Sequence, residues 1–288
     1  MPTLKTAARL CALVVPFLVA VAGIGPAAAV PGELPGAISH AGIQRTYLLH
    51  LPAGVDRPNG LVVNLHGAGQ NGGIQMGVTN FNAIADRQGF AVVYPDGIDL
   101  SWADGRGASV PDRQGVDDVG FLSALIEQVS RDHGVPPGRV FVTGMSAGAF
   151  MASRLACDRA DLVAAIAPVS GTLGSGVPCA PSRPVSVLQV HGTADFVVPF
   201  TGGPMVGRGG PSDVVAAPAA AQRWRDIDAC PAPVTTSLGG GVTGSTSAGC
   251  AGGTAVSFVQ IDGGGHVWPV GNYDASAAIG QFFAAHGR

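Results

Sequence analysis

Lysine is almost absent from this chain of 288 residues, and Lys5 is the only one. The rest of the sequence can therefore supply no Lys Schiff base, no Ser–Lys dyad and no P-loop lysine. The sequence also contains no H-E-x-x-H motif and no cluster of Cys and His at zinc-binding spacing. We expect a protein that uses neither a metal nor a cofactor.

Positive charge is scarce, with 16 Lys and Arg against 19 Asp and Glu and a formal net charge of −3. No basic stripe is left after the first residues, so neither nucleic acid nor an anionic membrane surface is an expected partner. Beyond residue 29 no stretch is long and apolar enough to span a bilayer. The sequence shows no internal repeat, interdomain linker or separate polymer-binding module, which predicts a single domain.

The first 29 residues have the composition of a secretory signal peptide. Lys5 and Arg9 form its positive end, residues 10–25 its apolar core, and residues 27–29 are alanines suited to cleavage. Cys11 stands at the start of the apolar core, whereas a lipoprotein cysteine would stand at its end. We predict a secreted protein with no membrane anchor after cleavage.

A nucleophile motif, Gly-Met-Ser-Ala-Gly, occupies residues 144–148. It follows a strand-like run at 139–143 and precedes a helix-like run at 149–156. This is the strand–turn–helix context of the G-x-S-x-G elbow, in which a sharp turn exposes the serine hydroxyl above a sheet. The context predicts that Ser146 is a nucleophile rather than part of a glycine-rich turn.

The other members of a serine hydrolase triad follow in the expected order of Ser, acid and His. Asp195 ends the loop after an apolar strand at 185–190, and His266 follows the strand at 255–261 on a glycine-rich loop. We predict that Asp195 is the acid, with Asp213 and Asp262 as alternatives, and that His266 is the base. His191 precedes the acid, so we expect a structural role for it beside the site.

An oxyanion hole is predicted from the sequence His-Gly-Ala-Gly at 66–69, which follows a buried strand at 61–65. In this kind of hydrolase, such a loop supplies one backbone N–H, and the residue after the nucleophile supplies the other. We assign these donors to Ala68 and Ala147, with Gly69 as the alternative to Ala68.

Strand-like and helix-like segments alternate along the chain, which predicts an α/β fold with a doubly wound, mostly parallel sheet. Residues 30–44 are expected to be an extended lead-in, poorly ordered as far as Gly42, and residues 45–288 the catalytic domain. The predicted strands are 45–51, 61–65, 90–94, 140–143, 164–169, 185–190 and 255–261, and the predicted helices are 81–88, 119–133, 147–156, 214–227 and 275–285.

Four cysteines follow the predicted signal peptide, at positions 157, 179, 230 and 250. An even number in an exported chain predicts two disulfides, and four cysteines allow three pairings.

Several motifs together resemble the polyhydroxybutyrate depolymerase and feruloyl esterase group, which includes the secreted LpqC-type esterases. They are LHGAGQ at 65–70, YPDG at 94–97, DDVGF at 117–121, GMSAG at 144–148, APVSG at 167–171, HGTAD at 191–195 and GHVWP at 265–269. The resemblance implies an α/β-hydrolase fold, hydrolysis of carboxylic esters, and the disulfides Cys157–Cys179 and Cys230–Cys250. Ala149 departs from the pattern, because the group would be expected to have a third glycine there.

The predicted substrate is a small or oligomeric ester, with a hydroxyalkanoate, feruloyl or acetyl acyl group. Two loops, 98–114 and 200–212, are expected to shape the pocket. Trp102 and Trp268 are candidates for stacking on an aromatic or sugar group, with ordinary packing as the alternative. We expect soluble esters to be hydrolysed better than solid polymer. The alternative function is a non-catalytic binding protein on the same fold.

Overall fold

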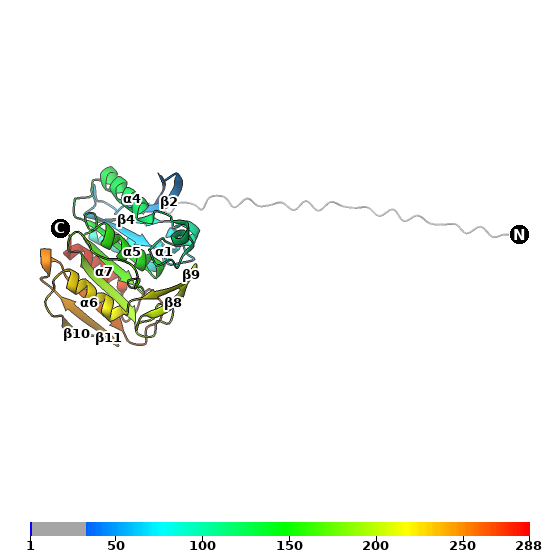
Figure 1. Cartoon of the computed structure of the whole chain (residues 1–288). Coiled ribbons are helices and arrows are strands. Elements are labelled where there is room, and N and C mark those ends of the chain that lie inside the picture. Colours follow the sequence, from blue (N-terminus) through cyan, green and yellow to red (C-terminus); the bar gives the residue numbers. More distant parts are fainter. Residues whose placement is uncertain (2–32) are drawn as a thin grey trace. The chain divides into compact units, whose positions relative to one another are not determined.

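Short apolar runs form the parallel centre of one large sheet (Figure 1). The computed structural model describes Met1 and residues 33–288, so the rest of the predicted signal peptide lies outside the described residues. The central strands are β4 (Phe90–Pro95), β3 (Gly60–Leu65), β5 (Val140–Met145), β6 (Ala165–Val169), β7 (Ser186–Gly192) and β12 (Val256–Ile261), and they are parallel in this spatial order.

Antiparallel hairpins extend the sheet on both sides. Strands β1 (Glu33–His40) and β2 (Ile43–His50) continue it beyond β4, and β11 (Val242–Ser247) and β10 (Val234–Gly239) continue it beyond β12. Within residues 33–288 the sheet has ten strands in the order β1-β2-β4-β3-β5-β6-β7-β12-β11-β10. The expectation of a poorly ordered lead-in was wrong for residues 33–40, which pair with β2 as the edge strand β1.

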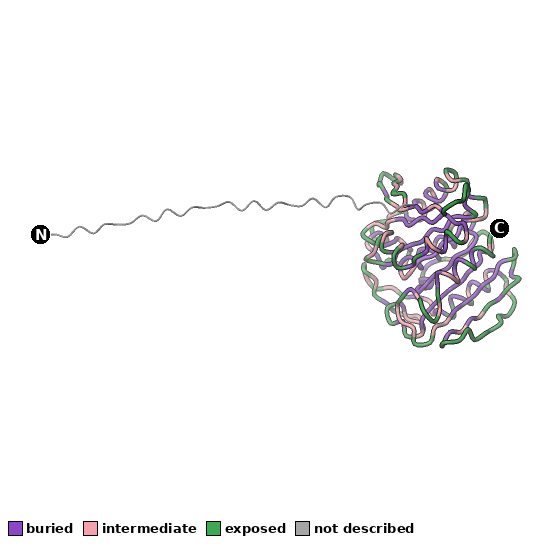
Figure 2. Tube along the Cα trace, turned by 180° about the vertical axis from the view of Figure 1, so that it is seen from behind, coloured by how far each residue is buried: buried purple, intermediate pink, exposed green. Residues whose placement is uncertain are grey.

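Helices cover both faces of this sheet, because the side chains of its strands alternate between two apolar cores. In β3, Leu61, Val63 and Leu65 belong to one core and Val62 to the other. The first core is closed by α4 (Asp118–His133), α5 (Ala147–Asp158) and α6 (Ala217–Ile227). The second is closed by α1 (Gly72–Thr79), α2 (Phe81–Gln88) and α7 (Ala275–Ala285). Figure 2 shows the buried strands as a purple band through the described chain.

The fold confirms the predicted α/β architecture and most of its elements. Helices α2 and α7 have the predicted bounds, whereas α6 begins at Ala217 rather than at residue 214, because Val214 ends the strand β9. The glycine-rich segment predicted as a loop contains a small hairpin, β8 (Gly203–Gly207) and β9 (Gly210–Val214). The segment 98–114 contains only two short helical turns, η1 (Ile98–Leu100) and α3 (Val110–Gln114).

Two disulfides close the fold, and their pairing is the one that the resemblance implied. Cys157 at the end of α5 pairs with Cys179, and Cys230 pairs with Cys250. The second disulfide joins the two ends of the β10–β11 hairpin, and residues 251–253 then form the turn η2 (Ala251–Gly253). Among the described residues, no helix has the length and apolar character that a membrane span requires.

Candidate active site

Ser146 occupies the turn between β5 and α5 with φ 53° and ψ −116°, a backbone conformation that non-glycine residues rarely adopt. Two glycines make this turn possible. A Cβ on Gly148 would lie 2.2 Å from the carbonyl oxygen of Leu65, and one on Gly144 would lie 2.7 Å from the same atom. Strand β3 and helix α5 are therefore packed too closely for any other residue at these positions, and this packing holds the Ser146 turn above the sheet.

Asp195 lies in the loop after β7, where both of its carboxylate oxygens accept hydrogen bonds. Oδ1 accepts the backbone N–H groups of Val197 and Val198, at 3.0 and 2.9 Å. Oδ2 is 2.9 Å from Nδ1 of His266. Burial raises the pKa of Asp195, but the hydrogen bonds from His266 and Val198 outweigh burial and leave the pKa below its ordinary value. The aspartate is therefore ionised at neutral pH and faces one nitrogen of the imidazole.

The loop of His266 is bound to the loop of Asp195 by backbone contacts. Ala194 donates its N–H to the carbonyl oxygen of Gly264 at 2.9 Å, and Gly263 donates to the hydroxyl of Thr193 at 2.8 Å. A Cβ on Gly192 would lie 2.2 Å from the Gly264 carbonyl oxygen, so that only glycine allows this approach. These contacts fix the imidazole relative to the carboxylate.

Ser146 and His266 line one pocket of about 250 Å³, together with Ala68 and Ala147. Among the described residues, no hydrogen bond within 3.5 Å joins Ser146 Oγ to the imidazole. Such contacts are often long in structures without a ligand and shorten when substrate binds. Asp213 and Asp262, the alternative acids, are exposed at other positions, on β9 and after β12.

The loop between β3 and α1 distinguishes between the two candidate oxyanion donors. The N–H of Gly69 already donates to the carbonyl oxygen of Leu100 at 2.8 Å. Ala68 lines the pocket, and Ala147 is the first residue of α5, whose N–H has no partner within the helix. The hydrogen bond to Leu100 favours Ala68 over Gly69 as the candidate donor beside Ala147.

Two buried histidines support the site. His66 donates from Nδ1 to the carbonyl oxygen of Gly67 at 2.8 Å and accepts the N–H of Gly97 at Nε2 at 2.9 Å, which holds the loop before Ala68. His191 donates from Nε2 to the carbonyl oxygen of Val198 at 2.9 Å. Burial lowers the pKa of both imidazoles, so at neutral pH they are uncharged and hold the neighbouring backbone through hydrogen bonds. The position of His191 agrees with the structural role predicted for it.

Trp102 and Trp268, the candidates for stacking on substrate, are buried, which favours the alternative of ordinary packing. Trp102 is 0% exposed, and its indole N–H donates to the carbonyl oxygen of His66 at 2.9 Å. Trp268 is 6% exposed, and its indole N–H donates to Ser276 at 2.9 Å. Both side chains support loops of the site from inside the core.

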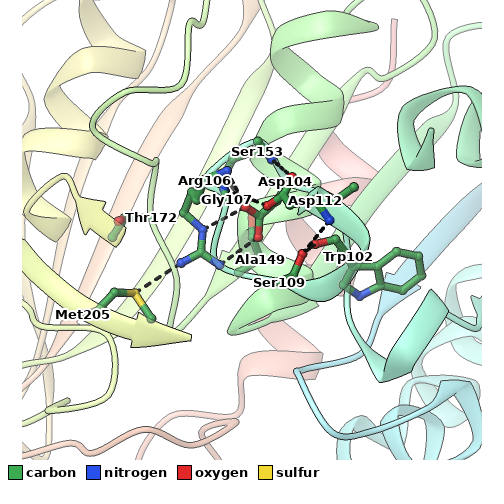
Figure 3. Close-up of polar contacts among 12 residues, drawn as sticks. Trp102, Asp104, Arg106, Gly107, Ser109, Asp112, Ala149, Ser153, Thr172 and Met205 are labelled. Carbon is green, nitrogen blue, oxygen red and sulfur yellow. Dashed lines mark hydrogen bonds and ion pairs between the residues drawn. The ribbon is translucent and has the colours of Figure 1, made fainter. Parts of the chain in front are cut away.

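Arg106 forms a wall of the pocket that the sequence did not predict (Figure 3). Its guanidinium donates two parallel hydrogen bonds to Asp104, at 2.9 and 2.8 Å, and lies 3.5 Å from the centre of the Phe150 ring. Its remaining nitrogen is 3.2 Å from the sulfur of Met205 on β8. The arginine thus joins the 98–114 loop to the β8–β9 hairpin. No local motif identifies this contact, because Phe150 and Met205 lie far from Arg106 in the sequence.

The loop between residues 102 and 112 is held by aspartates that accept backbone N–H groups. Asp112 accepts those of Gly105 and Gly107, at 2.8 and 3.0 Å, and its own N–H bonds to Ser109 (Figure 3). Asp118 accepts the N–H of Ala103 at 2.7 Å. These bonds replace the secondary structure that the loop lacks.

The sheet, the elbow and the ordered acid and histidine loops define a hydrolase of the α/β class. Residues 45–249 match the family described as Esterase PHB depolymerase. The chain belongs to this family and is a carboxylic-ester hydrolase.

The chain also has relatives that are named esterases. The chain is 33% identical over 253 residues to Feruloyl esterase C of Emericella nidulans, an alignment that covers 84% of each chain. It is 31% identical over 265 residues to the Putative esterase NocK of Nocardia uniformis subsp. tsuyamanensis, covering 83% of this chain and 75% of the relative. It is 33% identical over 159 residues to the Bifunctional acetylxylan esterase/xylanase XynS20E of Neocallimastix patriciarum, of which it spans only 22%.

Solved structures share the fold. The acetyl xylan esterase from Aspergillus awamori superposes with a TM-score of 0.60 at 16% identity, over 83% of this chain and 93% of that one. A thermostable esterase superposes with a TM-score of 0.57 at 16% identity, over 89% of this chain and 64% of that one.

Proposed function

We propose that this protein is a secreted serine esterase in which Ser146, His266 and Asp195 act as the catalytic triad. The observation that supports this most directly is the 2.9 Å contact between His266 Nδ1 and the Asp195 carboxylate, beside the pocket that His266 shares with Ser146. Each member comes from a different loop at the carboxyl end of a central strand, which is where this class of fold binds ligands.

In the proposed reaction, Ser146 Oγ attacks the ester carbonyl while His266 takes its proton. The carbonyl oxygen becomes negative and accepts the N–H groups of Ala68 and Ala147. Two fixed donors of this kind stabilise the tetrahedral intermediate by about 3 kcal/mol each. His266 then gives its proton to the leaving alcohol, which leaves an acyl group on Ser146.

Water completes the cycle. His266 takes a proton from the water, the hydroxide attacks the acyl-enzyme, and the proton returns to Ser146 as the carboxylic acid leaves. Asp195 stays ionised throughout, because its pKa lies below the ordinary value, and it holds the imidazole in the tautomer that has a free Nε2. Besides the ester and water, the proposed mechanism uses only residues of this chain.

The substrates we propose are small or oligomeric esters with feruloyl, acetyl or hydroxyalkanoate groups. Relatives named feruloyl esterase and acetylxylan esterase support the first two, and the family description supports the third. The pocket volume of about 250 Å³ suits a short acyl chain or a single aromatic ring.

We also propose export and the corresponding division of the chain. Residues 1–29 act as the signal peptide, and the catalytic domain, predicted as residues 45–288, also includes the edge strand β1 from Glu33 onward. The two disulfides support export, because such bonds persist in oxidising compartments.

Covalent labelling tests the proposed nucleophile. A fluorophosphonate should label the wild-type protein once, at Ser146, and Ser146→Ala should remove both the label and hydrolysis of 4-nitrophenyl acetate. Ser153→Ala is the matched control, because Ser153 is a buried serine of the same helix whose hydroxyl bonds to the Ala149 carbonyl oxygen. Near-normal turnover in Ser146→Ala, with the same fold by circular dichroism, would refute the mechanism.

A further inference from the structure

Arg208 lies at the turn of the β8–β9 hairpin and lines the pocket that contains Ser146 and His266. Its guanidinium extends to the oxyanion loop, since a Cβ on Gly69 would be 3.7 Å from its Nη1. Gly69 follows Ala68, the donor proposed to bind the reacting carbonyl oxygen. A positive charge therefore lies beside the scissile bond of any ester bound in the proposed way.

This charge has only a weak partner within the protein. Arg208 is 3.9 Å from the carboxylate of Asp99, and both side chains are nearly half exposed. Over residues 33–288, the guanidinium of Arg208 makes no hydrogen bond within 3.5 Å. Ion pairs of such length and exposure contribute little to stability, so the guanidinium is available to a ligand.

The other arginine of the pocket differs in this respect. Arg106 is almost fully buried, and two hydrogen bonds to Asp104 neutralise it. The described lining of the pocket contains these two arginines and no Asp or Glu. The positive charge of the lining without a close partner is therefore that of Arg208, and His266 is the other titratable group of the lining.

A nearby contact holds the hairpin turn in place over the pocket. Arg113 of α3 donates a hydrogen bond to the carbonyl oxygen of Gly209, the residue after Arg208. A Cβ on Gly207 would lie 2.5 Å from the Ala108 carbonyl oxygen, so the turn also packs directly on the 98–114 loop. Because these contacts hold the turn, the backbone of Arg208 has a fixed position beside the site.

We propose that Arg208 is a specificity residue that recognises a carboxylate carried by the substrate a few bonds from the scissile ester. This inference rests on the proposed serine esterase function and narrows its substrate class to anionic esters. A guanidinium binds a carboxylate through two parallel hydrogen bonds, which distinguishes it from a neutral amide of the same shape. The carboxylate belongs either to the acyl part, as in a half-ester of a dicarboxylic acid, or to the alcohol part, as in an acylated hydroxy acid.

Two matched pairs of substrates test the proposal and distinguish these sources. Monoethyl adipate and its carboxamide place the charge on the acyl part, and 4-acetoxybutanoate and its carboxamide place it on the alcohol part. The quantity to measure is the ratio of kcat/KM for the carboxylate to kcat/KM for the carboxamide. Titration of the released acid gives the rates of hydrolysis. We expect Arg208→Gln to lower this ratio by about fivefold to tenfold in one pair, mainly through KM, as for a partly exposed charged hydrogen bond.

Two further variants separate recognition from structure. Arg208→Lys keeps the charge but loses the planar fork, so the ratio should fall between those of the wild type and Arg208→Gln. Arg131→Gln is the matched control: Arg131 is an exposed arginine in a loose ion pair at 3.7 Å, at the end of α4 and outside the pocket. It should leave the ratio unchanged. Added salt should reduce the preference of the wild type for the carboxylate.

An unchanged ratio in Arg208→Gln for both pairs would overturn the subsite. Fluorophosphonate labelling distinguishes this result from failure of the proposed function. If the wild-type protein is labelled at Ser146 but Arg208→Gln has the same carboxylate-to-carboxamide ratio as the wild type, only the subsite is refuted. A folded wild-type protein that neither reacts with the label nor hydrolyses any of the four esters refutes the esterase mechanism and the subsite together.

Discussion

Replacing Asp195 by Asn should reverse the hydrogen bond that orients the catalytic imidazole. Oδ1 of Asp195 accepts two backbone N–H groups, from Val197 and Val198, at 3.0 and 2.9 Å. An asparagine will keep its carbonyl oxygen at that position, because an amide NH₂ there would face two donors. Its NH₂ then takes the place of Oδ2 and donates to Nδ1 of His266. The proton of the neutral imidazole moves to Nε2, which can no longer accept the proton of Ser146.

The size of the effect follows from the loss of this proton acceptor. In serine hydrolases an equivalent exchange costs on the order of 10⁴ in kcat, which corresponds to about 5.4 kcal/mol of activation free energy. The two backbone bonds to Oδ1 survive in the variant, so we expect little change in the loop. The rise in activation free energy should therefore be much larger than any fall in the free energy of unfolding.

Steady-state hydrolysis of 4-nitrophenyl acetate and the rate of fluorophosphonate labelling measure the effect, with thermal melts as a check on folding. Asp213→Asn and Asp262→Asn are matched controls, because these aspartates were the alternative acids and lie exposed elsewhere. Both should retain the wild-type rate. A loss below about tenfold in a folded Asp195→Asn protein would show that the carboxylate does not set the tautomer.

Three further results are expected. Reduction of the two disulfides, which close loops of 22 and 20 residues, should lower the free energy of unfolding by roughly 3 kcal/mol each, measured by urea unfolding with and without reductant; equal midpoints would contradict this. Burial raises the pKa of Asp228 to about 6, so the folded state holds the proton of this carboxyl more tightly than the unfolded chain does. As pH rises from 4 to 6, the free energy of unfolding of the wild type should therefore fall relative to that of Asp228→Asn, by up to about 1.4 kcal/mol per pH unit. A pH-independent difference between the melts of the two proteins would exclude this linkage. Gly148→Ala should prevent correct folding because its Cβ would meet the Leu65 carbonyl at 2.2 Å, whereas Gly77→Ala, with open space around it inside α1, should stabilise by about 0.5–1 kcal/mol; equal soluble yields and melts for the two variants would argue against the close packing at the elbow.

The parts of the site that the sequence predicted are those encoded by local pattern or by chain order. The elbow is a strand, a turn and a helix within a few residues, and its two glycines are required by packing that recurs wherever this turn occurs. Asp195 and His266 each follow an apolar strand, and the carboxyl ends of parallel strands meet at one edge of the sheet. The pairing of loops distant in sequence could therefore be predicted without coordinates.

The features that the sequence did not reveal depend on contacts between distant segments. Trp102 lies in a loop that is rich in glycine and aspartate and was a candidate for stacking on substrate. Its burial depends on the His66 carbonyl and on carboxylates that bind the backbone of its loop. Strand β1 has no clear apolar alternation, and its place follows from pairing with β2, from packing of Ile38 on the first core and from the contact of His40 with Asp117. Arg208 reaches the pocket only because the hairpin packs over it.

The Cys230–Cys250 disulfide also changes what a cut in the β10–β11 hairpin would do. The hairpin turn, residues 239–241, consists of three exposed glycines, and both flanking strands lie between the two cysteines. A protease that cleaves there breaks the backbone, but the two resulting fragments stay covalently joined through the Cys230–Cys250 disulfide. The nicked enzyme would stay in one piece, heavier only by the water that the cleavage adds, and the strand β12 that precedes the His266 loop would stay attached to the rest of the sheet. In an extracellular setting, the exposed β10 edge is thus one at which a single cut in the hairpin turn releases no fragment.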